Sequence, residues 1–300
     1  MSDLLLRNIL APVDLGHSSE AALRHARELA TRFGANLTVF YANDALTLQS
    51  YDEIYTGYRE LPEEQSEMME DAVRQYARPF MGDLAFDVHV VADDTPRAIA
   101  TEAERNDADL IVMGTHGRRS WQKLMAGSVA ESVLHATDRP VLAVPQESGG
   151  KAVSTVLCPI NFSPAARSAV QAACCLSRAF GAELNVVHVA TGDSGETEIS
   201  RLRDKVRAWL DPIVAPWCEF REIVSRGNDA AHHILEWAAK IGAGYLVVGA
   251  HKKPLSHARA TVGTTTERIL RAAPLPVLSV MHTGVTADIN SEEAFAVISH

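Results

Sequence analysis

The sequence has no apolar run of the length that a membrane span needs. It also lacks an excess of positive charge, since 28 Lys and Arg residues stand against 38 Asp and Glu residues, for a formal net charge of -10. A surface of that sign repels phosphate backbones and anionic lipid, so we expect neither nucleic acid nor a membrane as a partner. The N-terminus carries an acid, Asp3, where a signal peptide would carry bases. We therefore expect a cytoplasmic protein.

Cysteine is absent from the first half of the chain. The four cysteines are Cys158, Cys174, Cys175 and Cys218. Their spacing fits neither a disulfide framework nor a zinc site. We expect reduced and mostly buried thiols.

Several catalytic signatures are also missing. No Walker lysine loop, Rossmann glycine triplet or Gly-x-Ser-x-Gly elbow follows the first predicted strand. No general base is visibly paired with a nucleophile, so we assign no catalytic residue. His232 and His233 are adjacent on a predicted helix and therefore point in different directions, which is poor geometry for one metal ion. We predict no metal site built from side chains.

An internal repeat is the strongest signal that the sequence does contain. Four segments recur in the same order, which chance hardly supplies. They are Ile9–Asp14 with Val156–Asn161, Phe33–Ala35 with Phe180–Ala182, Leu110–Gly114 with Tyr245–Gly249, and Pro140–Val144 with Pro276–Val280. A polar, glycine-containing linker joins the two halves. We predict domains at residues 1–146 and 151–283, followed by a C-terminal tail at 284–300.

Strand and helix patterns alternate along each repeat. In the first repeat, short apolar runs predict strands at 9–13, 37–42, 85–91, 110–113 and 141–144. Apolar residues at helical spacing predict helices at 18–33, 63–81, 96–105 and 128–135. The fold class is therefore α/β, with two tandem doubly wound domains that each hold a five-stranded parallel sheet flanked by helices. Ligands of such sheets bind beyond the carboxyl ends of the strands.

A glycine pattern follows the fourth strand of the first repeat. Gly114-Thr115-His116-Gly117 is followed by nine residues and then by Gly127-Ser128, which opens the next helix. Glycines let backbone N–H groups approach an anion, and a helix N-terminus offers unpaired amides. Arg118 adds local positive charge to an otherwise acidic chain. Either glycine alone is read as a turn former, but the spaced set predicts a phosphate-binding loop.

This pattern resembles that of the ATP-binding universal stress proteins, and Pro12-Val13-Asp14 resembles the family's first strand and its acid. The resemblance covers roughly residues 6–145 and 153–282. It implies an adenine nucleotide α hydrolase-like fold, a bound ATP, ADP or AMP with Mg²⁺ held through the phosphates, and a homodimer. It also implies that Asp14 contacts the ribose or the metal-phosphate region and that Ala42 presents its backbone to adenine. The other contacts implied are Met113, Gly114, His116, Gly117, Gly127, Ser128 and Val129.

The second repeat departs from this pattern. Lys252 replaces the second glycine, the interval to Gly263 is one residue longer, and Asn161 replaces the acid at the end of the first strand. A side chain at Lys252 resists positive φ and crowds the loop, although its amine could still reach a different anion. We therefore expect the second repeat to pair with the first rather than to bind ATP.

Three functions remain open from the sequence. The first is a nucleotide-dependent regulatory module of the stress response, and the second is a slow ATPase. The third is a scaffold or a sensor of another small molecule. His116 is either a phosphate-orienting group or a turn residue. The long stretch 43–64 is a lid over the nucleotide, a contact surface or a solvated insertion.

Overall fold

The computed structural model describes residues 6–43, 59–60, 62–115, 129–149, 152–190, 192, 195–251 and 264–282. The chain divides into two compact units, one at Leu6–Gly149 and the other from Gly150 onward. Each sequence repeat falls within one unit. The C-terminal tail, most of the 43–64 stretch and the linker residues 150–151 lie outside the described residues.

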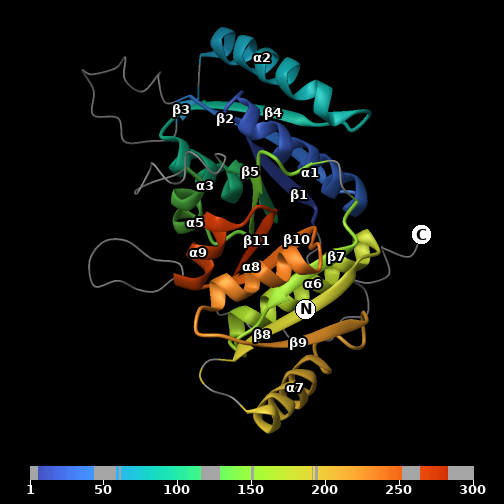
Figure 1. The fold of residues 1–300 in the computed structure, drawn as a ribbon. Coiled ribbons are helices and arrows are strands. Elements are labelled where there is room, and N and C mark those ends of the chain that lie inside the picture. The colour runs from blue at the N-terminus through green and yellow to red at the C-terminus, as the bar shows by residue number, and fades with distance from the viewer. Residues whose placement is uncertain are drawn as a thin grey trace. The chain divides into compact units, whose positions relative to one another are not determined.

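The first unit holds a sheet of strand order β3-β4-β2-β1-β5-β6 (Figure 1). Its strands are β1 (Asn8–Pro12), β2 (Asn36–Ala42), β3 (Arg59–Glu60), β4 (Asp87–Ala92), β5 (Leu110–Thr115) and β6 (Val141–Pro145). Its helices are α1 (His17–Phe33), α2 (Glu63–Met81), α3 (Thr95–Arg105) and α5 (Val129–Ala136). The five longer strands are parallel, as predicted. The two-residue β3, which pairs antiparallel with β4, was not predicted.

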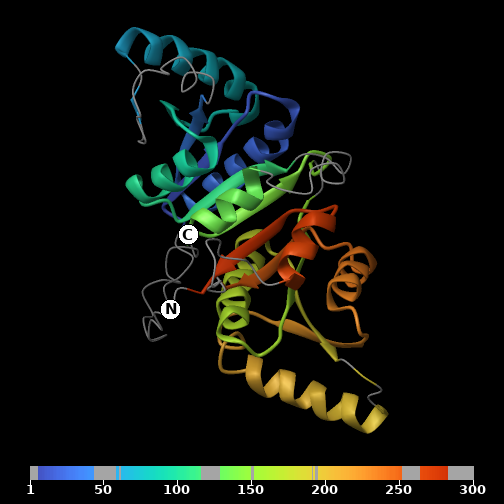
Figure 2. The same cartoon turned by 90° about the vertical axis from the view of Figure 1, so that its left-hand side faces the viewer.

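The second unit, which runs from yellow-green to red in Figure 2, repeats this architecture. Its strand order is β11-β10-β7-β8-β9 (Figure 1). Its strands are β7 (Thr155–Pro159), β8 (Glu183–Ala190), β9 (Phe220–Arg226), β10 (Tyr245–Ala250) and β11 (Val277–Met281). Its helices are α6 (Pro164–Phe180), α7 (Glu196–Leu210), α8 (Ala230–Lys240) and α9 (Thr264–Ala272). All of these strand pairs are parallel. The predicted doubly wound α/β fold with two repeats is confirmed.

Local sequence explains why α1 begins and ends where it does. Its apolar face, which includes Leu23, Ala26 and Leu29, is completely buried against the sheet. The helix ends at Gly34, whose φ of 64° is the left-handed conformation that glycine adopts without a Cβ penalty. The Gly34 N–H donates a hydrogen bond to the Ala30 carbonyl, which satisfies one of the last carbonyls of the helix.

The strand order of the first sheet reverses between β1 and β5. The chain moves outward in one direction through β1, β2 and β4, and in the other direction through β5 and β6. In open α/β sheets, ligands bind at the point where the strand order reverses, outside the carboxyl ends of the strands. The corresponding point of the second unit lies between β7 and β10. In the part of the chain that the structure describes, no helix is both long and apolar enough to span a bilayer.

A buried carboxylate joins α3 to the sheet of the first unit. Glu102 is 1% exposed, and its Oε1 lies 2.6 Å from Nδ1 of His89 on β4. The Asn106 side-chain amide also donates to this oxygen. The hydrogen bond to Glu102 raises the pKa of His89, and the desolvation of the imidazole opposes it only in part.

We expect the His89–Glu102 pair to make stability depend on pH. A histidine whose pKa is raised by folding stabilises the protein fully below its unfolded pKa of about 6.5. That stabilisation is lost as the pH rises through the folded pKa. Urea unfolding of the protein and of His89→Gln should therefore differ more at pH 5.5 than at pH 8.5. An equal difference at both pH values would show that the imidazole is not charged in this pair.

Candidate functional site

The carboxyl ends of β1, β2 and β5 meet at one edge of the first sheet. Pro12 pairs with Phe40 across β1 and β2, and Leu10 lies opposite Ile111 across β1 and β5. Beyond the end of β1, the Val13 N–H still donates to the Phe40 carbonyl at 2.8 Å. The parallel register therefore brings the predicted site residues Asp14, Ala42 and Gly114 to the same edge.

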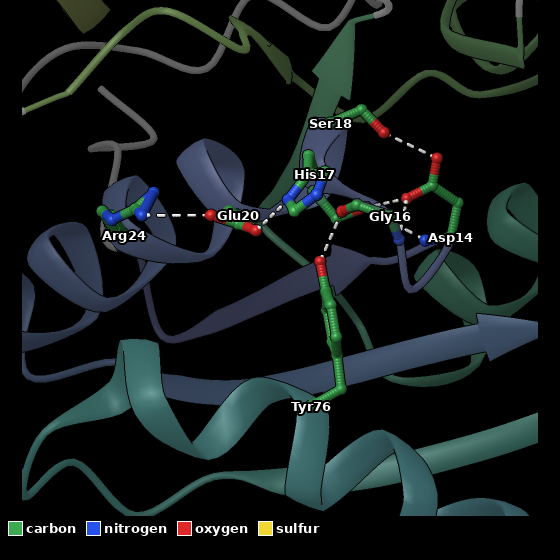
Figure 3. Close-up of polar contacts among 8 residues, drawn as sticks. Asp14, Gly16, His17, Ser18, Glu20, Arg24 and Tyr76 are labelled. Atoms are coloured by element: carbon green, nitrogen blue, oxygen red, sulfur yellow. Dashed lines mark hydrogen bonds and ion pairs between the residues drawn. The ribbon is translucent and has the colours of Figure 1, made fainter.

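The turn between β1 and α1 is organised by Asp14 (Figure 3). Asp14 Oδ1 accepts hydrogen bonds from the Gly16 N–H at 3.0 Å and from Ser19 Oγ at 2.6 Å. Its Oδ2 accepts one from Ser18 Oγ at 2.6 Å. Leu15 sits between them with a φ of 57°, a left-handed conformation that is uncommon for a side chain branched at Cγ. The carboxylate thus holds a strained turn at the edge of the sheet.

The charge of Asp14 is stabilised in the fold. Partial burial by itself would raise the pKa of this carboxyl, but hydrogen bonds from Ser18, Ser19 and Gly16 outweigh it, so the pKa is lowered. The lowered pKa keeps the Asp14 carboxyl ionised at neutral pH. A carboxylate has about four acceptor positions. Among the described residues, three of them are used, which leaves one on Oδ2 for a hydroxyl or a hydrated cation.

Tyr76 is a site residue that the sequence did not indicate. It projects from α2 toward the β1–α1 turn, and its hydroxyl donates to the Gly16 carbonyl at 2.6 Å (Figure 3). Burial, with the nearby charges of Asp14 and Glu20, raises the pKa of Tyr76 to about 12. The hydroxyl therefore stays protonated and ties α2 to the turn. Sixty residues separate the two partners, and no local pattern connects them.

Gly114 is required for packing of the fold. A Cβ at this position would lie 2.2 Å from the Ser18 carbonyl oxygen, which is main chain and has little freedom to move away. The first turn of α1 therefore packs directly on the backbone of β5. Gly249 has the same role in the second unit, where a Cβ would lie 2.5 Å from the Ala165 carbonyl. Packing alone therefore explains why β5 and β10 each carry a glycine near their carboxyl end, whether or not a ligand binds there.

The remaining predicted site residues divide into two groups. Pro12, Val13 and Met113 are buried, so only their backbones could face a ligand, whereas Ala42 is half-buried and Val129 begins α5. The other predicted residues lie outside the described part of the chain. They are His116, Gly117, Arg118, Gly127 and Ser128. The phosphate-binding loop itself therefore stays a prediction.

The second unit keeps the geometry of this turn but not its charge. Asn161 Oδ1 accepts from the Ser163 N–H at 3.2 Å, as Asp14 does from Gly16. Phe162, in the position of Leu15, has a φ of 61°. The two repeats therefore differ by one negative charge on closely similar backbones. Lys252 and Gly263 lie outside the described residues.

A cavity of about 280 Å³ lies at this edge of the second unit. It is lined by the ends of β7, β8 and β10 and by the first turns of α6 and α9. Its polar side chains include Asn161, Ser163, His188, His251 and Thr265. His188 is oriented by a 3.0 Å contact between its Nδ1 and the Ile160 carbonyl, and its ring packs 4.8 Å from that of Phe162. The volume lies just below the range of about 300–1,000 Å³ that is usual for small-molecule sites.

Comparison with known proteins identifies the family. The model of the universal stress protein family matches residues 6–145 and 153–280, so the chain belongs to this family. A universal stress protein of Methanocaldococcus jannaschii is 24% identical over 159 residues, which are 48% of this chain and 98% of that protein. Relatives of this kind thus correspond to one of the two repeats.

Two solved structures share the fold over nearly the whole chain. A universal stress protein from Archaeoglobus fulgidus has a TM-score of 0.69 and 21% identity, and the match covers 94% of this chain and 99% of that one. A functionally unknown protein from Pseudomonas aeruginosa has a TM-score of 0.60 and 15% identity, with 93% of each chain covered. At these sequence identities, the two structural similarities support the assignment of the fold alone.

Proposed function

We propose that this protein is a nucleotide-dependent regulatory module of the stress response whose first repeat binds ATP. The stress-response role accords with its membership of the universal stress protein family. Occupancy of the site would set the order of the loops around it and thereby the choice of partner. Pairing of the two repeats within one chain, and a homodimer of two chains, belong to the same proposal.

The observation that carries this proposal is the position of Asp14. Its ionised carboxylate stands at the point of strand reversal, with an acceptor position on Oδ2 that no described residue uses. A ribose hydroxyl or a hydrated Mg²⁺ is a suitable partner for such an oxygen. The end of β5, from which the Gly114–Gly117 loop departs, belongs to the same edge.

The residues of this edge suggest a division of roles. Asp14 would hold the ribose or the metal-phosphate region, and the Ala42 backbone would face adenine. Mg²⁺ would come with the phosphates and would neutralise part of their charge. The amides of Gly117 and of Ser128 at the start of α5 would bind the phosphates, with Arg118 nearby. Charged hydrogen bonds contribute roughly 1.5–3 kcal/mol each, so three or four of them near the upper end of this range reach the roughly 8 kcal/mol of micromolar affinity.

Gly117→Val tests this function. A branched side chain at a loop glycine opposes positive φ and fills the space of a phosphate, so we expect ATP affinity to fall at least about tenfold. Isothermal titration calorimetry of the purified protein should give about one ATP per chain before the change and a dissociation constant at least about ten times higher after it. Mass spectrometry of the ligand released from freshly purified, denatured protein should identify an adenine nucleotide.

Lys252→Val is the matched control, because Lys252 occupies the position of Gly117 in the second repeat. It should leave ATP affinity and stoichiometry unchanged. Two ATP molecules per chain, or equal losses in both variants, would contradict the assignment of the site to the first repeat. Failure of the unchanged protein to bind any adenine nucleotide would end the proposal.

The 280 Å³ cavity favours a second candidate function, the sensing of a small molecule by the second repeat. Its lining combines an amide, hydroxyls and two imidazoles, which suits a neutral or anionic polar compound better than a bare cation. A small-molecule thermal-shift screen on the full chain and on His188→Ala would test it. Compounds that stabilise only the parent protein would support the second repeat as a sensor, and equal shifts for both proteins would place them elsewhere.

A further inference from the structure

Two cysteine sulfur atoms of the second unit are in close contact. Cys174 lies on α6, and Cys218 lies in the segment between α7 and β9. Their Sγ atoms are 2.8 Å apart, although 44 residues separate them in the sequence. Both cysteines are free thiols, as are Cys158 and Cys175. Since a disulfide bond measures about 2.0 Å, closure of this pair needs less than about 1 Å of movement along the line that joins the two sulfur atoms.

The two thiols differ in their surroundings. Cys174 is 3% exposed, whereas Cys218 is half-buried and lines an open cavity of about 710 Å³. The hydrogen bond from Cys174 lowers the pKa of Cys218, and the positive charge of Arg178 lowers it further against the effect of burial. The same hydrogen bond and burial raise the pKa of Cys174. Cys218 is therefore the more accessible and more acidic of the two thiols, and Cys174 is the buried thiol behind it.

The cavity beside Cys218 carries both signs of charge. Arg207 pairs with Glu222 at 2.8 Å, and Arg221 pairs with Glu183 at 3.1 Å. Arg178 also lines this cavity, and its positive charge acts on Cys218. A small neutral oxidant can enter such a cavity without an electrostatic penalty. Cys158 provides a contrast, because it is completely buried and burial raises its pKa.

We propose that Cys174 and Cys218 form a redox pair that hydrogen peroxide converts to a disulfide. The Cys218 thiolate attacks one peroxide oxygen, which forms an S–O bond, breaks the O–O bond and releases hydroxide. The Cys174 sulfur then attacks the sulfur of the Cys218 sulfenic acid, which forms the S–S bond and breaks the S–O bond. The proton of Cys174 leaves with that oxygen as water. The hydroxide from the first step takes up the proton that Cys218 lost on forming its thiolate. One peroxide and two thiols thus yield one disulfide and two water molecules, and a thiol reductant reverses the change.

Closure of this pair would connect two parts of the second unit that no described disulfide joins. The bond would link α6 to the segment that enters β9. The first turn of α6 contributes Ala165 and Ala166 to the 280 Å³ cavity. Oxidation therefore constrains a helix that also borders the candidate small-molecule site. The redox pair is independent of ATP binding by the first repeat.

Peroxide treatment of the reduced full-length protein tests the pair. We expect the intact mass to fall by about 2 Da, for the loss of two hydrogen atoms. The number of reactive thiols in denaturant should fall from four to two. Trypsin digestion without reductant should then link peptide 168–178, which contains Cys174 and Cys175, to peptide 208–221, which contains Cys218. Dithiothreitol should separate the two peptides.

Serine variants identify the partner, because serine is nearly isosteric with cysteine and circular dichroism can verify the fold. Cys174→Ser and Cys218→Ser should each abolish the linked peptide. Cys175→Ser is the matched control on the same helix and should retain it. A link that survives in Cys174→Ser, a peroxide reaction that stops at a sulfinic acid on Cys218, or four thiols that stay unchanged would each overturn the proposal.

Discussion

We expect Gly114→Ala to lower the free energy of unfolding by about 3 kcal/mol, as overpacking of a tight contact does. The added Cβ would stand 2.2 Å from the Ser18 carbonyl oxygen, so either β5 or the first turn of α1 must move. Movement of α1 would also disturb the hydrogen bonds of Ser18 and Ser19 to Asp14. Urea unfolding followed by circular dichroism should show the first unit unfolding at a lower urea concentration.

Gly149→Ala is the control for this variant, because a Cβ at that position has no atom within 4 Å. Its effect should stay within about 0.5 kcal/mol. Hydrogen exchange should place the loss in Gly114→Ala at β1, α1 and β5, since local contacts decide which amides open first. A Gly114→Ala protein as stable as Gly149→Ala would show that α1 does not pack on this backbone.

Phe40→Ala is expected to have an effect of similar or greater size, about 3–5 kcal/mol. Phe40 lies on β2 at the paired position of Pro12 and has no exposed surface. Its ring also packs 6.0 Å from the ring of His89. Removing the ring leaves a cavity directly beneath the edge that carries Asp14, so both the stability and the register of β1 with β2 should suffer. Denaturant unfolding measures the first effect, and hydrogen exchange of the β1 and β2 amides measures the second.

Met68→Ala serves as the comparison for Phe40→Ala, because Met68 is 66% exposed on α2. It should change stability by no more than about 0.5 kcal/mol. Phe40→Leu should fall between the two, since it keeps most of the buried apolar volume. If Phe40→Ala cost no more than Met68→Ala, the centre of the first sheet would not be closely packed.

The secondary structure was largely predictable because it depends on local periodicity. The predicted helix at 63–81 matches α2 (Glu63–Met81), and the predicted strand at 37–42 is within one residue of β2 (Asn36–Ala42). Buried strands and amphipathic helices repeat their apolar residues within a few positions, and glycine marks the helix ends. The short β3 escaped prediction because two residues are too few to form a pattern.

The candidate site was less predictable because its contacts are distant in the sequence. Asp14 was selected from its position at the end of a strand, but its three internal hydrogen bonds were not foreseen. Tyr76 reaches Gly16 from another helix, and Cys174 meets Cys218 across 44 residues. Gly114 was interpreted as a phosphate-binding glycine, whereas the fold already needs it for helix packing. A sequence pattern does not distinguish a glycine that is needed for helix packing from one that is needed for phosphate binding.

The left-handed residue that follows each first strand has an evolutionary consequence. Leu15 and Phe162 hold nearly the same φ, and in both turns the preceding side chain accepts a hydrogen bond from the backbone N–H two residues further on. The side chains of the two turns differ, and Phe162 packs against His188 and Trp209. After a gene duplication, the two copies can therefore acquire different ligands through a few side-chain substitutions, while the backbone fold stays the same.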